Sequence, residues 1–142
     1  MNTLDSRGPA YGAFVLRVAS GLAFLAHGLY LKVFVFTMPG TVGFFESLGL
    51  PGFTAWLTVI GETVGGLMLI LGIGVRVASL WLIAILLGAV WTHAPNGWLF
   101  TSPNGGWEYP LFWTAAQVAI LLLGPGAFAL RAASLQRQPA TA

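Results

Sequence analysis

The chain has no cysteine and very few charged residues. The absence of cysteine excludes disulfides, thiolate catalysis, Cys-ligated iron–sulfur clusters and CxxC redox chemistry on this chain. Charged residues make up 7% of the 142 residues, whereas soluble domains carry about 25%. The six basic residues are scattered and the net charge is only +2. No nucleic-acid partner is therefore expected, because such binders need clustered Lys and Arg.

Hydrophobic residues, by contrast, make up 57% of the chain. A soluble fold of this length could not bury so much apolar surface. The composition therefore predicts an all-α membrane protein with the lipid bilayer as its first partner. The N-terminus lacks a standard signal peptide with a cleavage site, so the first apolar helix is expected to serve as an uncleaved signal-anchor.

Four apolar stretches are candidates for membrane spans, since a span needs about 20 mostly apolar residues. They cover residues 10–36, 53–73, 77–92 and 109–123, the last being short. Turn signals rich in Pro, Gly and Asn separate them, with long loops after the first and third spans. We find no linker and no second domain. The prediction is a single transmembrane domain over residues 1–142, folded as a four-helix transmembrane bundle.

The positions of the arginines predict the orientation of this bundle. Arg7 precedes the first span, Arg76 lies in the tight link between the second and third, and Arg131 and Arg137 follow the fourth. By the positive-inside rule, these segments are cytoplasmic. The expected topology is N-in and C-in, with the two long loops facing outward.

Small residues recur at four-residue spacing within the spans. Gly61 and Gly65 form one such pair, and Ala84 and Gly88 another. This spacing lets helix backbones approach closely in lipid, so both pairs are expected to pack helices together.

Arg17 and His27 in the first span and Glu62 in the second are ionisable residues placed well inside apolar stretches. Each is costly in a bilayer unless it is paired, and such residues often mark ligand sites or proton paths. At about 1.5 Å of rise per residue, Arg17 lies roughly 10 Å from the inner end, Glu62 roughly 18 Å and His27 roughly 25 Å. Glu62 could therefore pair with Arg17 below or His27 above. The arrangement is either a buried Arg–Glu pair that fixes packing, or a site for a polar or redox-active small molecule or for protons.

A second group of polar residues lies near the outer ends of the spans and could form a ligand entrance. Its members are Lys32, His93, Asn96, Glu108 and Tyr109. His27, His93 and Glu108 match no metal-ligand spacing, so no metal site is predicted. Alternatively, His93 ends a helix and bonds a loop carbonyl, and Glu108 is an acid at a helix N-terminus.

In these segments the chain resembles the DoxX family of small bacterial membrane proteins. The resemblance extends from about Arg17 to Gly126 and rests on the order and spacing of several short motifs. They are Arg17, His27-Gly28, Lys32-Val-Phe, Gly40-Thr-Val-Gly-Phe-Phe-Glu46, Gly49-Leu-Pro-Gly52, Glu62-Thr-Val-Gly-Gly66, Gly72…Arg76, His93-Ala-Pro-Asn-Gly97 and Gly106-Trp-Glu-Tyr-Pro110. Lys32 follows His27 by five residues, where four is usual in the family.

The resemblance implies a four-helix bundle in the bacterial inner membrane and a link to redox metabolism. The family takes its name from a subunit linked to thiosulfate oxidation with quinone as acceptor, and for most members no reaction is established. The leading hypothesis is a membrane component of a quinone-linked redox system, that is, an oxidoreductase subunit. In it His27 hydrogen-bonds a quinone oxygen, Glu62 relays protons and Arg17 holds the charge of Glu62.

No flavin, haem or nucleotide motif is visible in the sequence, so the electron donor would be a partner protein. Self-association is a further expectation. Two other classes of function stay open. One is a non-catalytic membrane anchor or scaffold subunit, and the other is a small transporter or proton path.

Overall fold

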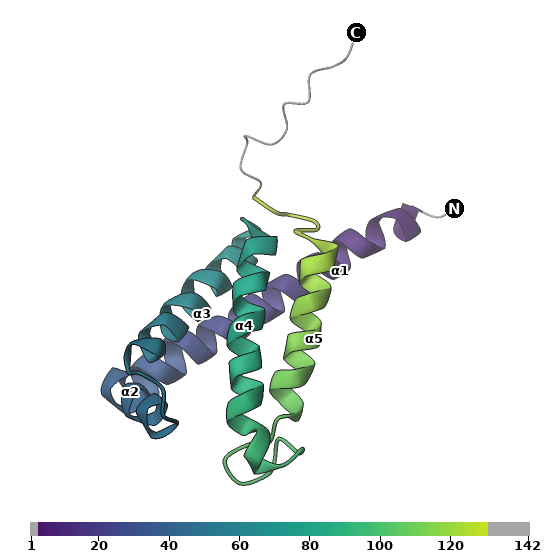
Figure 1. Cartoon of the computed structure of the whole chain (residues 1–142). Coiled ribbons are helices and arrows are strands. Elements are labelled where there is room, and N and C mark those ends of the chain that lie inside the picture. The colour runs from purple at the N-terminus through teal and green to yellow at the C-terminus, as the bar shows by residue number, and fades with distance from the viewer. Residues whose placement is uncertain (1–2, 131–142) are drawn as a thin grey trace.

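The computed structural model describes residues 3–130, and their side chains from residue 7 onward. Within this range all secondary structure is helical (Figure 1). Five α-helices are present: α1 (Thr3–Leu25), α2 (Met38–Ser47), α3 (Phe53–Leu71), α4 (Val75–His93) and α5 (Glu108–Leu123). A π-helical segment, η1 (Ala26–Val35), continues α1 directly, and a short 3-10 turn, η2 (Ala94–Asn96), follows α4.

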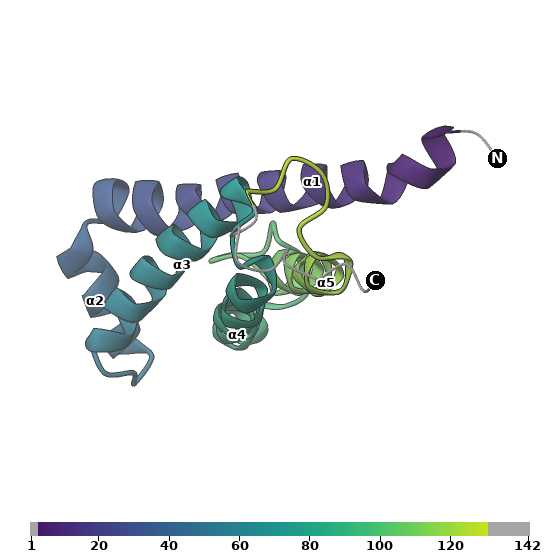
Figure 2. The same ribbon diagram turned by 90° about the horizontal axis from the view of Figure 1, so that it is seen from above.

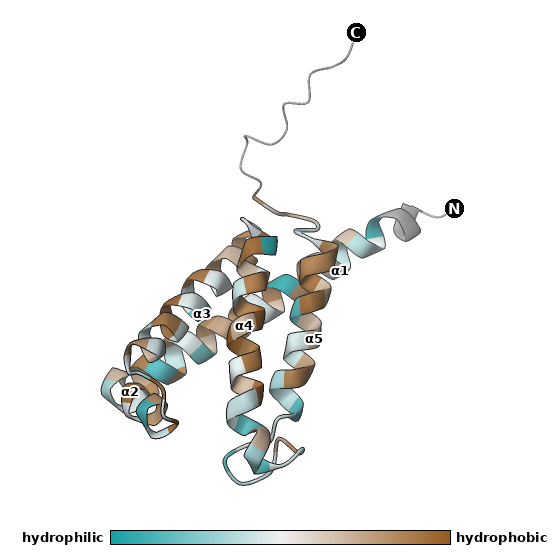
Figure 3. Cartoon of the chain, in the orientation of Figure 1, coloured by the Kyte–Doolittle hydropathy of each residue, from teal (hydrophilic) through white to brown (hydrophobic). Residues whose placement is uncertain are grey.

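Three of the expected spans appear as helices long and apolar enough to cross a membrane. They are α1 with η1, α3, and α4 with η2. The fourth expected span is the apolar helix α5, which has only 16 residues. Many residues of α3, α4 and α5 are apolar (Figure 3), and many of their large apolar side chains are exposed. A surface of this kind belongs in lipid, so the chain is a membrane protein.

The first long loop differs from expectation because it contains α2. Met38-Pro39-Gly40 had the composition of a turn, yet it begins a helix, with Pro39 in the first turn, where the missing N–H costs nothing. Thr37 precedes it with a left-handed φ of 63°, and its hydroxyl accepts a hydrogen bond from the Gly40 amide at 3.4 Å. The cap fixes α2 beneath α3 and η1, which it contacts.

The four long helical segments contact one another in sequence around a ring. The tilted α1 packs on α3 and α5, and α4 lies on the other side, packed on α3 and α5 (Figure 2). Glycines allow the closest approach of α1 to α3. A β-carbon on Gly21 would lie 2.7 Å from the Gly66 carbonyl oxygen, and one on Gly66 would lie 2.8 Å from that of Gly21.

The two predicted small-residue pairs behave differently. A β-carbon on Gly61 would collide with the Trp81 indole of α4, and one on Gly65 would lie 3.0 Å from Leu82. This pair therefore packs α3 against α4, as predicted. Around Gly88, in contrast, no atom lies within 4 Å of the position a β-carbon would take. The prediction for the second pair was wrong at Gly88, because no other helix packs against it.

A series of buried side-chain hydrogen bonds joins α1, α4 and α5. The Trp113 indole donates to the Ser20 hydroxyl at 2.8 Å, which donates to Gln117 at 2.8 Å. The Gln117 amide then donates to the Ser79 hydroxyl at 2.9 Å. Because buried polar groups are costly unless bonded, these contacts hold α1, α4 and α5 in register.

The start of α4, which carries Arg76, lies at the same end of the structure as the end of α5 (Figure 1). Arg131 and Arg137, which also supported the predicted orientation, lie outside the described residues.

Candidate functional site

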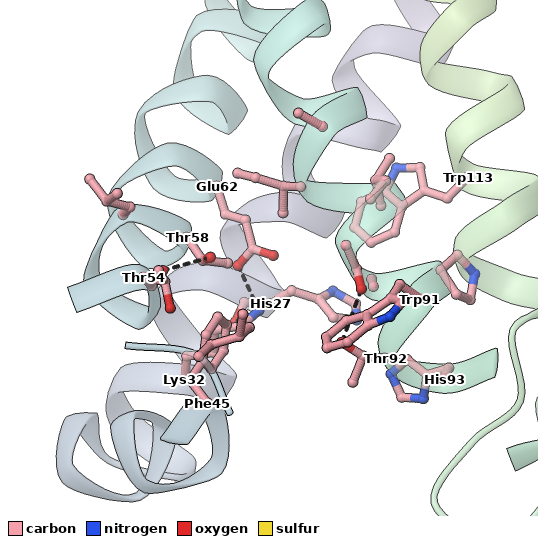
Figure 4. Close-up of a pocket in the computed structure, with 18 of the residues that line it drawn as sticks. His27, Lys32, Phe45, Thr54, Thr58, Glu62, Trp91, Thr92, His93 and Trp113 are labelled. Carbon is pink, nitrogen blue, oxygen red and sulfur yellow. Dashed lines mark hydrogen bonds and ion pairs between the residues drawn. The ribbon is translucent and has the colours of Figure 1, made fainter. Parts of the chain in front are cut away.

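A pocket of about 530 Å³ lies between the lower halves of α3 and α4 (Figure 4). The π-helical segment η1 closes it on one side, α2 lies beneath, and the start of α5 completes it. Its walls are mainly apolar and aromatic. The aromatic lining comprises Phe44, Phe45, Trp81, Trp91, Tyr109 and Trp113. A volume of this size is typical of small-molecule sites.

An ion pair between Lys32 and Glu62 forms the most polar part of this pocket. The Lys32 ammonium nitrogen lies 2.7 Å from Glu62 Oε2, and the two side chains are 20% and 8% exposed. The same nitrogen lies 3.5 Å from the His27 carbonyl oxygen. The pair is thus largely desolvated, and removing either side chain would leave the other charge without a partner.

The π-helix explains why Lys32 reaches Glu62 although it stands five residues after His27. In an α-helix a residue five positions on lies about 140° round the axis, at about 100° per residue. A π-helix bonds residues five apart, which returns the fifth residue to the same face. Lys32 and His27 consequently both face the pocket. Segments of this kind are rare and often occur at functional sites.

His27 presents one ring nitrogen to the pocket. Its Nδ1 lies 2.9 Å from the Ala23 carbonyl oxygen. Because a carbonyl can only accept, Nδ1 carries the hydrogen and Nε2 of the neutral ring is a hydrogen-bond acceptor. The imidazole also packs 5.1 Å from the Trp113 ring, centroid to centroid. Its side chain lies between Glu62 and the residues of α4 (Figure 4).

The predicted entrance residues divide into two groups. Lys32, His93 and Tyr109 line the pocket with His27 and Glu62, whereas Asn96 and Glu108 do not. His93 Nδ1 donates to the carbonyl oxygens of residues 104 and 105, at 3.2 and 3.0 Å, and Asn96 donates to the same two oxygens.

The two hydrogen bonds of His93 confirm the alternative prediction that it ends a helix and bonds a loop carbonyl. Glu108 accepts a hydrogen bond from the Phe100 amide at 3.2 Å. Asn96 and Glu108 shape the loop that follows α4. Among the described residues, no three His, Asp or Glu side chains gather as a metal site would require.

Arg17 does not meet Glu62, so the expected pairing of these residues was wrong. Its guanidinium is fully buried and donates to four carbonyl oxygens. Two belong to Leu69 and Ile70 at the end of α3, at 2.5 and 2.6 Å. The others belong to Pro125 and Ala127, at 2.8 and 3.0 Å. Arg17 thus ties the end of α3 to the segment after α5, away from the pocket.

Several lining residues were not singled out from the sequence. On α4, Trp81, Ile85 and Thr92 all face the pocket. Their spacing of four and seven residues is that of one helical face, so the periodicity could have shown that they act together. It could not have shown that this face borders a pocket, because a lipid-facing stripe has the same pattern.

Comparisons with known proteins agree with the resemblance noted in the sequence. The family model described as DoxX matches residues 12–95, more than half of the chain. The chain belongs to the DoxX family. A curated relative, "Putative oxidoreductase CatD" of Bacillus subtilis (strain 168), is 36% identical over 112 residues, covering 77% of this chain and 78% of the relative. No solved structure matches this DoxX chain significantly. The matched region contains Lys32, Glu62 and His27, so the pocket's polar residues lie within the family domain.

Proposed function

We propose that this chain is the membrane component of a quinone-linked redox system. In this proposal the pocket between α3 and α4 receives the head group of a quinone. The observation that carries it is the Lys32–Glu62 ion pair beside His27 in an otherwise apolar, aromatic-walled pocket. Flat aromatic walls suit a flat ring, and a few polar groups at one end suit its oxygens. The name of the Bacillus subtilis relative supports the redox class.

The proposal places the four long helical segments across the inner membrane of a bacterium as a four-helix bundle. The ring of helix contacts and the exposed apolar surfaces support that arrangement. Both termini would be cytoplasmic, as Arg76 at the start of α4 and Arg7 near the N-terminus favour. The pocket would then lie in the outer half of the bilayer.

The residues of the pocket have distinct roles in this scheme. The Lys32 ammonium has three N–H groups. One donates to Glu62 and one points to the His27 carbonyl, so the third is available to a quinone oxygen. Neutral His27 accepts from a hydroxyl through Nε2, and the protonated ring donates to a carbonyl oxygen.

Reduction of a quinone to a quinol takes up two electrons and two protons. A partner redox protein would supply the electrons. The protons would pass through His27 and through Glu62, whose Oε1 is not the atom bonded to Lys32. These acid–base groups lie in a site largely shielded from water, where they can be positioned for transfer.

The test is a binding titration of the purified chain in lipid nanodiscs with a short-tailed ubiquinone analogue. Trp81, Trp91 and Trp113 line the pocket, so quenching of tryptophan fluorescence reports occupancy. Wild type should show saturable quenching, and Glu62→Gln and His27→Gln should each weaken binding about tenfold, or about 1.4 kcal/mol.

Glu46→Gln is the matched control, since Glu46 is exposed on α2 and does not line the pocket. It should bind as wild type does. Quenching that never saturates, or a folded Glu62→Gln that binds normally, would contradict the proposal. The anchor function would then be the better account.

A further inference from the structure

The pocket has the Lys32–Glu62 ion pair and His27 on one side, and part of its opposite wall on α4 consists of small residues. Lys32, Glu62 and His27 lie on the side of η1 and α3. On α4 the wall passes over Ala84, Gly88 and Ala89. No atom lies within 4 Å of the point where a β-carbon on Gly88 would stand. Ala84 and Gly88 are also exposed, so no other part of the described chain covers α4 at this point.

Exposed aromatic side chains frame this part of the wall. Trp81 and Trp91 both line the pocket and are 49% and 57% exposed. Ten residues of α-helix separate them, or about 15 Å along the axis of α4. Opposite, on α3, Leu57 lines the pocket and is 47% exposed. Side chains that border both a pocket and the apolar outer surface mark an opening between the two.

We infer that the pocket opens sideways into the bilayer between α3 and α4, over Gly88, and that its ligand is a quinone with a long apolar tail that leaves through this opening. The inference rests on the proposed function and adds the substrate class. A water-soluble, tail-less quinone would have no use for an apolar exit at mid-membrane. A prenyl-type tail fits it, because Leu57, Ala84 and Gly88 offer no side-chain polar atom that would have to be desolvated.

The arrangement also accounts for Gly88. Four-residue spacing of small residues in membrane helices ordinarily brings two helices together. Ala84 and Gly88 have that spacing, yet α3 stays away from Gly88. A chain of methyl-branched carbons lying across α4 would use the space that a neighbouring helix does not fill.

The experiment compares two ubiquinone analogues that share one head group, one without a tail and one with a decyl tail. Both are titrated into nanodiscs containing wild type or Gly88→Leu, with tryptophan quenching as the readout. A β-carbon at position 88 would have no atom within 4 Å, so a leucine side chain can be placed there without displacing a neighbour at its base. The dissociation constant of the tailed analogue should rise about tenfold, whereas that of the tail-less analogue should change less than about twofold.

Gly12→Leu is the control, because Gly12 is also exposed on a long apolar helix and has no atom within 4 Å of its β-carbon position. Gly12→Leu should leave the dissociation constants of both analogues unchanged. Partitioning of the analogues into lipid is the same in all variants, so it cannot produce a difference between Gly88→Leu and this control. Ala84→Leu, one turn earlier in the same wall, repeats the test with a second substitution. Thermal unfolding of each variant must match wild type.

The outcomes separate this inference from the proposed function. If the tail-less analogue binds and Gly88→Leu and Ala84→Leu leave the tailed analogue unaffected, or weaken both analogues equally, the lateral opening is wrong and the quinone site stands. If neither analogue binds to wild type, the proposed function fails, and this inference fails with it.

Discussion

Gly28 lies directly against Glu62, with no room for a side chain between them. A β-carbon on Gly28 would stand 2.7 Å from Glu62 Cβ and 3.2 Å from Oε2. The π-helical segment therefore approaches α3 as closely as backbone allows, at the level of the buried carboxylate. This contact fixes the distance across which Lys32 reaches Glu62, so the glycine determines the geometry of the ion pair.

Gly28→Ala should consequently destabilise the protein and disturb the pocket together. Forcing a methyl group into a packed interface costs about 1–3 kcal/mol. We expect a lower midpoint of thermal unfolding in detergent and weaker quinone binding. Gly12→Ala, whose β-carbon meets nothing within 4 Å, is the matched control and should behave as wild type. An unchanged midpoint for Gly28→Ala would show that η1 can move away from α3 at little cost.

The Lys32–Glu62 pair should show strong energetic coupling. Removing one member of a largely buried pair leaves the other charge unpaired, at a cost of about 3 kcal/mol or more. Lys32→Met and Glu62→Gln should therefore each lower the free energy of unfolding. The double variant should recover much of the loss, because no unpaired charge remains. Equilibrium unfolding of the four proteins gives the coupling energy. Additive losses would mean that the two side chains are solvated independently.

The membrane spans could be predicted from the sequence, because long apolar runs separated by Pro and Gly leave few other solutions. The expected second span, 53–73, is α3 (Phe53–Leu71), and the expected third, 77–92, is α4 (Val75–His93). Helix α2 could not be recognised in the same way. Its first turn contains Pro39 and Gly40, which are frequent in loops, and only the cap at Thr37 shows that they begin a helix.

The partners of the buried charges were harder to predict, and for two physical reasons. The depths expected for Arg17, His27 and Glu62 assume helices that stand upright in the membrane. Helix α1, which carries Arg17, is instead tilted across the others (Figures 1 and 2). The hydrogen bonds of Arg17 also all go to backbone carbonyls, and every residue type has a carbonyl, so the sequence does not reveal these partners. Lys32 was assigned to the entrance rather than to Glu62, since its face of the helix depends on the π-helical geometry.

Arg17 should therefore matter for stability and not for ligand binding. Arg17→Lys keeps the charge but cannot reproduce a planar fork that reaches four carbonyl oxygens. Hydrogen bonds to charged groups contribute about 1.5–3 kcal/mol each, so losing one or two should lower the free energy of unfolding by about 2–4 kcal/mol. Quinone affinity of the folded fraction should stay within about twofold of wild type.

Arg7→Lys, at an exposed position near the start of α1, is the control for this substitution and should change neither quantity. If Arg17→Lys lost much of its quinone affinity at an unchanged free energy of unfolding, Arg17 would belong to the functional site after all. The two measurements together thus distinguish a positioning residue from a residue that contacts the ligand.

The predicted orientation can be tested directly because the chain has no cysteine of its own. Thr101→Cys places a single thiol at an exposed position in the loop before α5, and Ile73→Cys places one in the link between α3 and α4. If the arginines are cytoplasmic, the loop faces outward and the link faces inward. A membrane-impermeant maleimide should label Thr101→Cys in intact bacterial cells, and Ile73→Cys only after lysis. Cysteine-free wild type gives the background. The reverse pattern would place the pocket in the inner half of the bilayer, where a partner redox protein in the cytoplasm would reach it more closely.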